Sequence, residues 1–216
     1  MSHPVAGRLP SRRRFTIAAL STLLLSLATL TVLLLSLAAP TTATQELTSE
    51  ARFRSYVTGY SYWDNTPAGS ATIAFPRSRY GTLHTRAGGT GTYGNPITVA
   101  VGHSIIGGVS HPRFEPGTRF YIPNLRRYFI VEDQCGDGRR PQTRGCWTGF
   151  PEGAQNWLDV WVGGANTDRA ISDRCMTAIT KTVTTIVHPR PDYAVATGDI
   201  SGRTCTRQYG DTAILG

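Results

Sequence analysis

An all-β domain, built as a sandwich or a small barrel, is the fold class that this 216-residue sequence predicts. Three observations carry that prediction. Short segments rich in aromatic and β-branched residues recur along the chain, glycine-containing turns separate them, and only one segment has a helical pattern. The expected strands are residues 53–63, 97–101, 119–122, 128–131, 157–162 and 183–187.

The turns and the single helix are predicted from particular residues. Pro116-Gly117 suits the centre of a type II turn, because proline presets the first φ and glycine supplies the positive second φ. The expected helix runs from Asp168 to Thr180, with Thr167 as its N-cap. We therefore expect one short helix beside a mainly β structure.

The N-terminal residues have the pattern of an export segment. Arg12, Arg13 and Arg14 precede the uncharged stretch 15–39, and small residues near position 43 offer cleavage sites. The run 11–15 also resembles the twin-arginine signal. A retained membrane anchor is the alternative, because 25 uncharged residues in a helix are long enough to span a bilayer. We expect a signal or anchor at 1–43, a linker at 44–50 and one domain at 51–216, secreted or held at the cell wall.

The formal charge of +8 does not indicate nucleic-acid binding. Arg8 and the three arginines at 12–14 lie in the leader, and the remaining basic residues are spread over loops without a nucleic-acid motif. A mild attraction to anionic wall polymers fits this distribution as well. We expect no nucleic-acid partner, and membrane contact only through the N-terminal segment if it is not cleaved.

Four cysteines in an exported domain of this size predict two disulfides. Three pairings are possible, and proximity in the sequence favours Cys135 with Cys146 and Cys175 with Cys205. A zinc site is the weaker alternative, since the chain has no C-x-x-C and its five histidines lack paired ligand spacing. No nucleotide-binding or G-x-S-x-G motif is present either, so we expect neither a metal nor a cofactor.

Carboxylates at strand positions are the candidate functional groups. Alternation along 157–162 places Trp157, Asp159 and Trp161 on the face opposite the apolar residues. An acid between two indoles is the composition of a sugar-binding surface, because the rings stack on pyranose faces and the carboxyl binds hydroxyls or transfers a proton. The alternative is that the tryptophans cover a small core while Asp159 binds an arginine or a backbone amide.

Two further aspartates follow expected strands. Alternation places Asp133 on one face with Phe129 and Val131, where apolar neighbours would favour its protonated form. Asp64 shares a face with Tyr60 by the same rule. For both acids the alternative is a structural role, since each stands where a turn begins.

Four segments in order resemble the double-psi β-barrel pattern of the 3D domain and RlpA-like proteins. They are residues 97–101, 116–123, 129–133 and 158–163. More distantly, Tyr62-Trp63-Asp64 and Leu158-Asp159 are similar to the two acid motifs of family 45 endoglucanases, and the barrel is shared with expansins and barwin-like proteins. The resemblance implies a six-stranded double-psi β-barrel with disulfide-tied loops.

The resemblance also implies a function on extracellular polysaccharide. In the 3D and lytic-transglycosylase relatives an aspartate of these motifs protonates the glycosidic oxygen of peptidoglycan, which by position implies Asp133 and Asp159 here. The endoglucanase similarity adds Asp64 as a third catalytic candidate. The aromatic candidates for sugar binding are Tyr62, Trp63, Trp157 and Trp161. We thus expect a monomer that cleaves peptidoglycan or another wall glycan by aspartate acid–base catalysis, as a lytic transglycosylase or a glycoside hydrolase.

Two rival functions remain open. Gly102-His103 stands where the family's first aspartate is expected, which favours an expansin-like or lectin-like module that binds polysaccharide without cleaving it. A barwin-type interaction module would need no convergent acids at all. Carboxyls within about 10 Å of each other in one groove would favour hydrolysis over both rivals.

Overall fold

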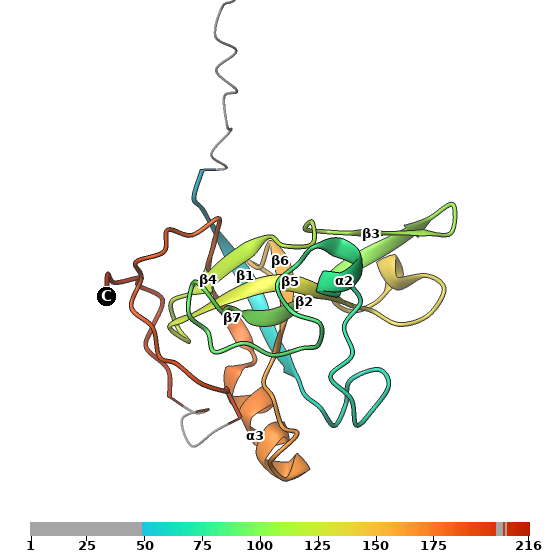
Figure 1. Ribbon diagram of the computed structural model, residues 1–216. Helices are drawn as coiled ribbons and strands as arrows, with labels where there is room; N and C mark the ends of the chain where they lie inside the picture. Colours follow the sequence, from blue (N-terminus) through green and yellow to red (C-terminus); the bar gives the residue numbers. More distant parts are fainter. Residues whose placement is uncertain (1–48, 202–204, 206) are drawn as a thin grey trace, which may run out of the picture. The chain divides into compact units, whose positions relative to one another are not determined.

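A computed structural model describes residues 49–201, 205 and 207–216 (Figure 1). The expected export segment and most of the linker lie outside these described residues. These described residues belong to one compact unit. Within the described ranges, no helix has the length and apolar character needed to cross a membrane.

Seven strands form a single mixed sheet, which confirms the mainly β class. They are β1 (Ala51–Tyr60), β2 (Ile97–Ile106), β3 (Val109–Pro112), β4 (Arg119–Ile122), β5 (Arg127–Cys135), β6 (Asn156–Trp161) and β7 (Lys181–Val187). Their order is β3-β2-β5-β4-β7-β1-β6. An additional pairing of β6 with β2 closes the sheet. Six strands therefore close into a ring, while β3 projects from it as a hairpin on β2 (Figure 1).

Closure of the sheet separates an enclosed apolar face from an outer face. Val99 pairs with Val160 and with Val131, and all three side chains are fully buried in the main core cluster. The alternation expected along β6 is confirmed, because Leu158, Val160 and the following Val162 are buried together. The residues between them, Trp157 and Asp159, are directed outward and only partly buried.

A β-bulge in β5 changes the face on which one predicted acid lies. Val131 pairs with Val99, but the next residue of β2, Ala100, pairs with Asp133, so Glu132 is the extra residue. Val99 and Ala100 point to opposite faces. Asp133 therefore lies on the outer face, and its predicted position beside Phe129 and Val131 is wrong because simple alternation has no extra residue.

Helix α3 (Arg169–Ile179) packs against β1, where Ile179 and Met176 approach Gly59. The helix is confirmed with shorter bounds, but its N-cap position is Asp168 rather than Thr167. The short helices α2 (Arg77–Tyr80) and η2 (Pro141–Thr143) were not expected, nor was β3.

The turn and disulfide predictions are confirmed. Gly117 has φ 90°, and the Thr118 amide donates to the Glu115 carbonyl at 3.0 Å, as a type II turn requires. Cys135 is bonded to Cys146, and Cys175 to Cys205. The first bond ties β5 to the loop before β6, and the second ties α3 to the C-terminal tail.

Candidate functional site: an acidic pocket on the outer face of the sheet

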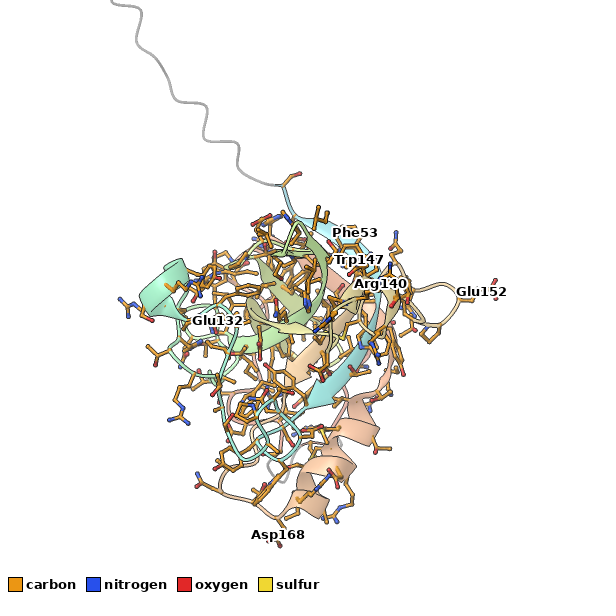
Figure 2. The ribbon with its side chains drawn as sticks, turned by 90° about the vertical axis from the view of Figure 1, so that its right-hand side faces the viewer. Phe53, Glu132, Arg140, Trp147, Glu152 and Asp168 are labelled. Atoms are coloured by element: carbon orange, nitrogen blue, oxygen red, sulfur yellow. A yellow bond between two sulfur atoms is a disulfide. The ribbon has the colours of Figure 1, made fainter. Side chains whose placement is uncertain are left out.

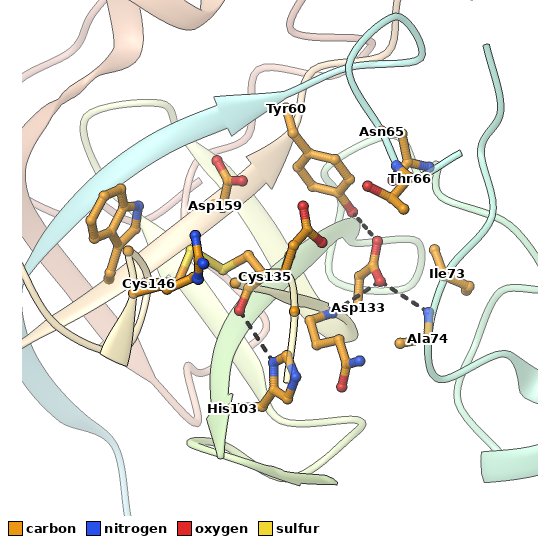
Figure 3. A pocket seen from close by; sticks show the side chains of 18 of the residues that line it. Tyr60, Asn65, Thr66, Ile73, Ala74, His103, Asp133, Cys135, Cys146 and Asp159 are labelled. Atoms are coloured by element: carbon orange, nitrogen blue, oxygen red, sulfur yellow. Dashed lines mark hydrogen bonds between the residues drawn. A yellow bond between two sulfur atoms is a disulfide. The ribbon is translucent and has the colours of Figure 1, made fainter. Parts of the chain in front are cut away.

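One pocket of about 720 Å³ opens on the outer face of the closed sheet (Figure 3). Its floor is formed by residues of β1, β2, β5 and β6, and its walls by the segments 64–66, 72–74, 136–138 and 144–146. Three predicted acids and one predicted tryptophan line it: Asp64, Asp133, Asp159 and Trp157. Residues nearly 100 positions apart in the chain thus share one cavity.

Strand pairing fixes the spacing of two of these acids. Ala100 on β2 is the paired neighbour of Asp133 on one side and of Asp159 on the other. All three side chains consequently lie on the same face. Two strand spacings separate the Cα atoms of the acids by about 10 Å. The methyl group of Ala100 leaves space between them.

Asp133 is held by three hydrogen-bond donors. The Tyr60 hydroxyl donates to Oδ2 at 2.9 Å, and the amides of Ala74 and Gln134 each donate to Oδ1 at 2.9 Å (Figure 3). Only 7% of the residue's surface is exposed. Burial raises the pKa of Asp133 to about 6, although the three donors favour the ionised form and oppose this shift.

Asp159 has a less polar environment. The Thr58 hydroxyl donates to Oδ1 at 2.6 Å. A carboxylate oxygen of Asp159 also lies within 4.8 Å of the sulfurs of Cys135 and Cys146. Burial raises the pKa of Asp159 to about 7, with a smaller contribution from the negative charges of Asp64 and Asp133.

The neighbouring disulfide does not make this a metal site. Zinc binds cysteine as the thiolate, and the two sulfurs here are bonded to each other. Within the part of the chain that the structure describes, this group is the sole convergence of three or more candidate metal ligands. The two sulfurs therefore do not serve as thiolate ligands beside Asp159.

Asp64 combines a turn role with a position in the pocket. Its Oδ1 accepts hydrogen bonds from the amide and the hydroxyl of Ser61, both at 2.7 Å. This is the structural role that the turn sequence indicated. The residue still lines the cavity, where its charge acts on Asp159.

The four aromatic candidates do not form one platform. Trp157 lines the pocket, whereas Trp161 is only 6% exposed and packs edge-on against Tyr60 with ring centroids 5.2 Å apart. Trp161 is therefore a core residue and offers no surface to a ligand, because a β1 side chain covers it. Tyr62 and Trp63 contact each other outside this pocket, and the Trp63 indole donates to the Thr167 carbonyl.

Sequence reasoning missed the residues that hold the acids in place. Thr58 and Tyr60 alternate on β1 and donate to Asp159 and Asp133 respectively. A period-two pattern ending in Tyr60 could have indicated that both face outward, but not which acids they meet. His103 also lines the pocket, and burial lowers its pKa.

Glu132, the bulged residue beside Asp133, is another group that no sequence pattern singled out. Its side chain is fully buried and accepts hydrogen bonds from the Leu83 and His84 amides, from the Thr98 hydroxyl and from the His84 ring. The His84 ring nitrogen Nε2 lies 2.8 Å from the Asn95 side-chain oxygen. An oxygen beside each ring nitrogen favours the protonated form of the ring, and the Glu132 hydrogen bond raises the pKa of His84.

Fold and pocket together define a disulfide-tied, closed β domain with an acidic pocket on its outer face. The chain belongs to the DDB_G0273701 N-terminal domain family, whose model matches residues 52–206. It is 33% identical over 150 residues to an uncharacterized protein of Dictyostelium discoideum, a match that covers 69% of this chain and 56% of that protein. The chain thus matches little more than half the length of that relative. No solved structure matches the chain significantly.

Proposed function

We propose that this protein is an exported double-psi β-barrel that cleaves glycosidic bonds of a cell-wall polysaccharide, with peptidoglycan as the expected polymer. The observation that carries the proposal is a pair of carboxyls, Asp133 and Asp159, that face one pocket beside Trp157 and differ in their hydrogen bonding. Six strands closed into a ring support the double-psi assignment. The export and wall location rest on the leader pattern.

The different environments of the two acids suggest their roles. Asp159, with one donor and a pKa of about 7, is the general acid that transfers its proton to the glycosidic oxygen as the bond from C1 breaks. Asp133, with three donors and a pKa of about 6, is the carboxylate that accepts a proton as the new bond to C1 forms. Near pH 6.5 the first is largely protonated and the second largely ionised, as this division requires.

The spacing of the acids favours a step with a nucleophile between them. Inverting glycosidases hold their carboxyls about 6.5 to 9.5 Å apart to admit a water molecule. The two side chains leave the same face from Cα atoms about 10 Å apart. Carboxyl groups carried in this way suit the wider spacing of inverting enzymes better than the narrower spacing of retaining enzymes. In a lytic transglycosylase a sugar hydroxyl would take the place of the water.

Stacking on Trp157 gives the sugar a binding surface at the edge of the pocket. The Trp157 ring contacts Tyr56 edge-on at 4.8 Å, which holds the indole in place. One saccharide unit on Trp157 would extend over Asp159 toward Asp133. The Trp157→Ala variant is therefore expected to bind the polymer about tenfold more weakly, while the exposed Glu152→Gln variant should bind as the wild type does.

The test separates binding from cleavage. The purified protein is incubated with insoluble peptidoglycan and, separately, with cellulose, and both the protein retained on the polymer and the soluble fragments are measured. We expect fragments from peptidoglycan with the wild type, and retention without fragments for Asp159→Asn and Asp133→Asn. If neither polymer retains the protein or releases fragments, the proposed function is wrong.

A non-catalytic binding module is the second candidate, and one observation favours it. Gly102 stands where the family's first aspartate is expected, and a Cβ at this position would lie 2.4 Å from the Cys146 carbonyl oxygen. The disulfide-tied loop thus occupies the space of a side chain there. Retention of the wild-type protein on peptidoglycan without any fragments would select this candidate.

A further inference from the structure

We propose that Thr58 is a positioning residue for Asp159, and that the Trp157 indole fixes the direction in which the Thr58 hydroxyl donates. The inference rests on the proposed function for its consequence in catalysis. Its geometry and its principal test need no substrate. It assigns a role to a threonine that no sequence motif marks.

The three side chains form a continuous hydrogen-bonded chain. Thr58 on β1 is the paired neighbour of Asp159 on the parallel strand β6, so their side chains lie together on the outer face. The Trp157 Nε1 donates to the Thr58 Oγ1 at 2.7 Å, and the Thr58 Oγ1 donates to the Asp159 Oδ1 at 2.6 Å.

The first bond favours one direction for the second, because it occupies one of the two acceptor positions of the Thr58 oxygen. An indole N–H can only donate, so the Thr58 oxygen must accept from Trp157. The single proton of the hydroxyl is then available for Asp159. Without the indole both acceptor positions are free, so the hydroxyl would rotate more easily and accept more readily from a protonated Asp159.

The chain also determines which carboxyl oxygen carries the reactive proton. Oδ1 accepts the Thr58 hydrogen bond, whereas Oδ2 accepts none from the described residues. A proton on Asp159 therefore lies on Oδ2, the oxygen that remains free to donate to a ligand in the pocket. Thr58 thus both orients the carboxyl and lowers its pKa by stabilising the ionised form.

Two neighbours hold the Trp157 ring, one of them at its benzo edge. Tyr56 contacts it edge-on, and a Cβ on Gly145 would lie 3.4 Å from the Trp157 Cη2, so the loop before β6 lies against the ring. That loop is tied to β5 by the Cys135–Cys146 disulfide. The indole is consequently a fixed donor, which a freely rotating side chain would not be.

Other ionisable groups near Asp159 are unchanged by substitutions at Thr58. Asp64 and Asp133 are the acids that raise its pKa, and the Tyr60 hydroxyl lies on the same side. The pocket is also lined by His103, Asp137 and Arg144. A difference between Thr58 variants therefore reports the hydroxyl itself.

The test is a carboxyl titration of the purified protein followed by carbon-13 NMR. We expect Thr58→Val to raise the pKa of Asp159 by about one unit, because the donor that the described residues supply to Oδ1 is lost. Thr58→Ser keeps a hydroxyl and should restore the wild-type pKa. Thr72→Val is the matched control, since Thr72 lines the same pocket without bonding to an acid, and it should leave the titration unchanged.

A second variant tests the indole. Trp157→Phe keeps an aromatic ring without the N–H and should move the Asp159 pKa in the same direction as Thr58→Val, by a smaller amount. An unchanged pKa in Thr58→Val, or a failure of Thr58→Ser to restore it, would overturn the proposal. An unchanged Asp159 pKa in Trp157→Phe would show that the indole does not fix the direction of the Thr58 hydrogen bond.

Activity gives a readout that a merely structural role would not move. If Asp159 is the general acid, activity is lost as it deprotonates, so Thr58→Val should shift the alkaline limb of the pH profile upward by the same amount as the NMR pKa. Should no polymer be cleaved, the proposed function fails while the titration still decides the role of Thr58.

Discussion

Asp159 is the residue at which function and stability are expected to conflict. Its pKa of about 7 lies far above its ordinary value of 3.8, so above neutral pH the folded protein holds a carboxylate in a site that disfavours the charge. An isosteric neutral side chain would remove that cost. Groups at functional sites commonly reduce stability in this way.

We therefore predict that Asp159→Asn stabilises the protein at pH 8. Because the pocket partly exposes the side chain, the expected gain in the free energy of unfolding is about 2 kcal/mol. Near pH 4 the gain should be much smaller, since the wild-type carboxyl is then neutral in the folded state. Urea unfolding at both pH values measures this. Figure 2 shows Glu152 on an outlying loop, and Glu152→Gln provides a control that should change neither value.

Among the elements, strand β5 carries the feature on which the site depends most. The bulge at Glu132 turns Asp133 outward, and the bulged residue is anchored by hydrogen bonds to β2 and to the segment 83–84. Removing one partner of a buried ion pair is strongly destabilising, because the other partner is left without its hydrogen bonds and its counter-charge.

Glu132→Gln should lower the free energy of unfolding by about 3 kcal/mol, because the amide leaves His84 without its anionic partner. The exposed Glu115→Gln variant should lie within about 0.5 kcal/mol of the wild type. Denaturant unfolding of the two variants decides the matter. Equal stabilities would mean that the buried ion pair does not hold the bulge.

The two disulfides differ in their distance from the pocket, and this separates their expected effects. Each should contribute about 3 kcal/mol by restricting the unfolded chain. The double variant Cys175→Ala with Cys205→Ala should lose stability without changing the Asp159 titration, because its bond ties α3 to the tail. Cys135→Ala with Cys146→Ala should change both, since its sulfurs lie beside Asp159. A pocket titration disturbed equally by both double variants would contradict this division.

For the whole molecule, the combined pKa shifts of the buried ionisable groups predict how the free energy of unfolding depends on pH. The pKa values of Asp133, Asp159 and His84 are all raised, so from about pH 4 to beyond pH 7 the folded state binds more protons than the unfolded state. Stability should fall as pH rises through this window. His103 has a lowered pKa, so by itself it would make stability rise with pH below about pH 6.5, but it is one group against three. Thermal unfolding between pH 4 and 8 measures the slope, and a melting temperature that rises steadily over that range would contradict the prediction.

The sequence predicted the parts of the fold that are set locally. Strand 119–122 has the expected bounds, because its residues and the Pro116-Gly117 turn before it act over a few positions. The pairing of nearby cysteines was predicted for the same reason. By contrast, β3 was missed because Val109–Pro112 contains a histidine and a proline and is a strand only through its hairpin with β2.

The candidate site was predicted as a set of residues but not as an arrangement. Alternation directed Asp159 outward correctly, since β6 is regular over its whole length. It failed for Asp133, because a bulge depends on a buried carboxylate that local pattern does not reveal. For Trp161 the alternation held but the expected exposure did not, because Tyr60, from a strand about 100 positions away, covers the indole.

The most direct test of the account is whether a wall saccharide occupies the pocket. A soluble peptidoglycan oligomer is titrated into nitrogen-15-labelled protein, and chemical shifts are followed by NMR. We predict that the changes concentrate on the Trp157 indole N–H and on the amides of Ala74 and Gln134, which bond to Asp133. Changes confined to β4 and β7, or no changes at saturating oligomer, would contradict the claim that this pocket acts on polysaccharide.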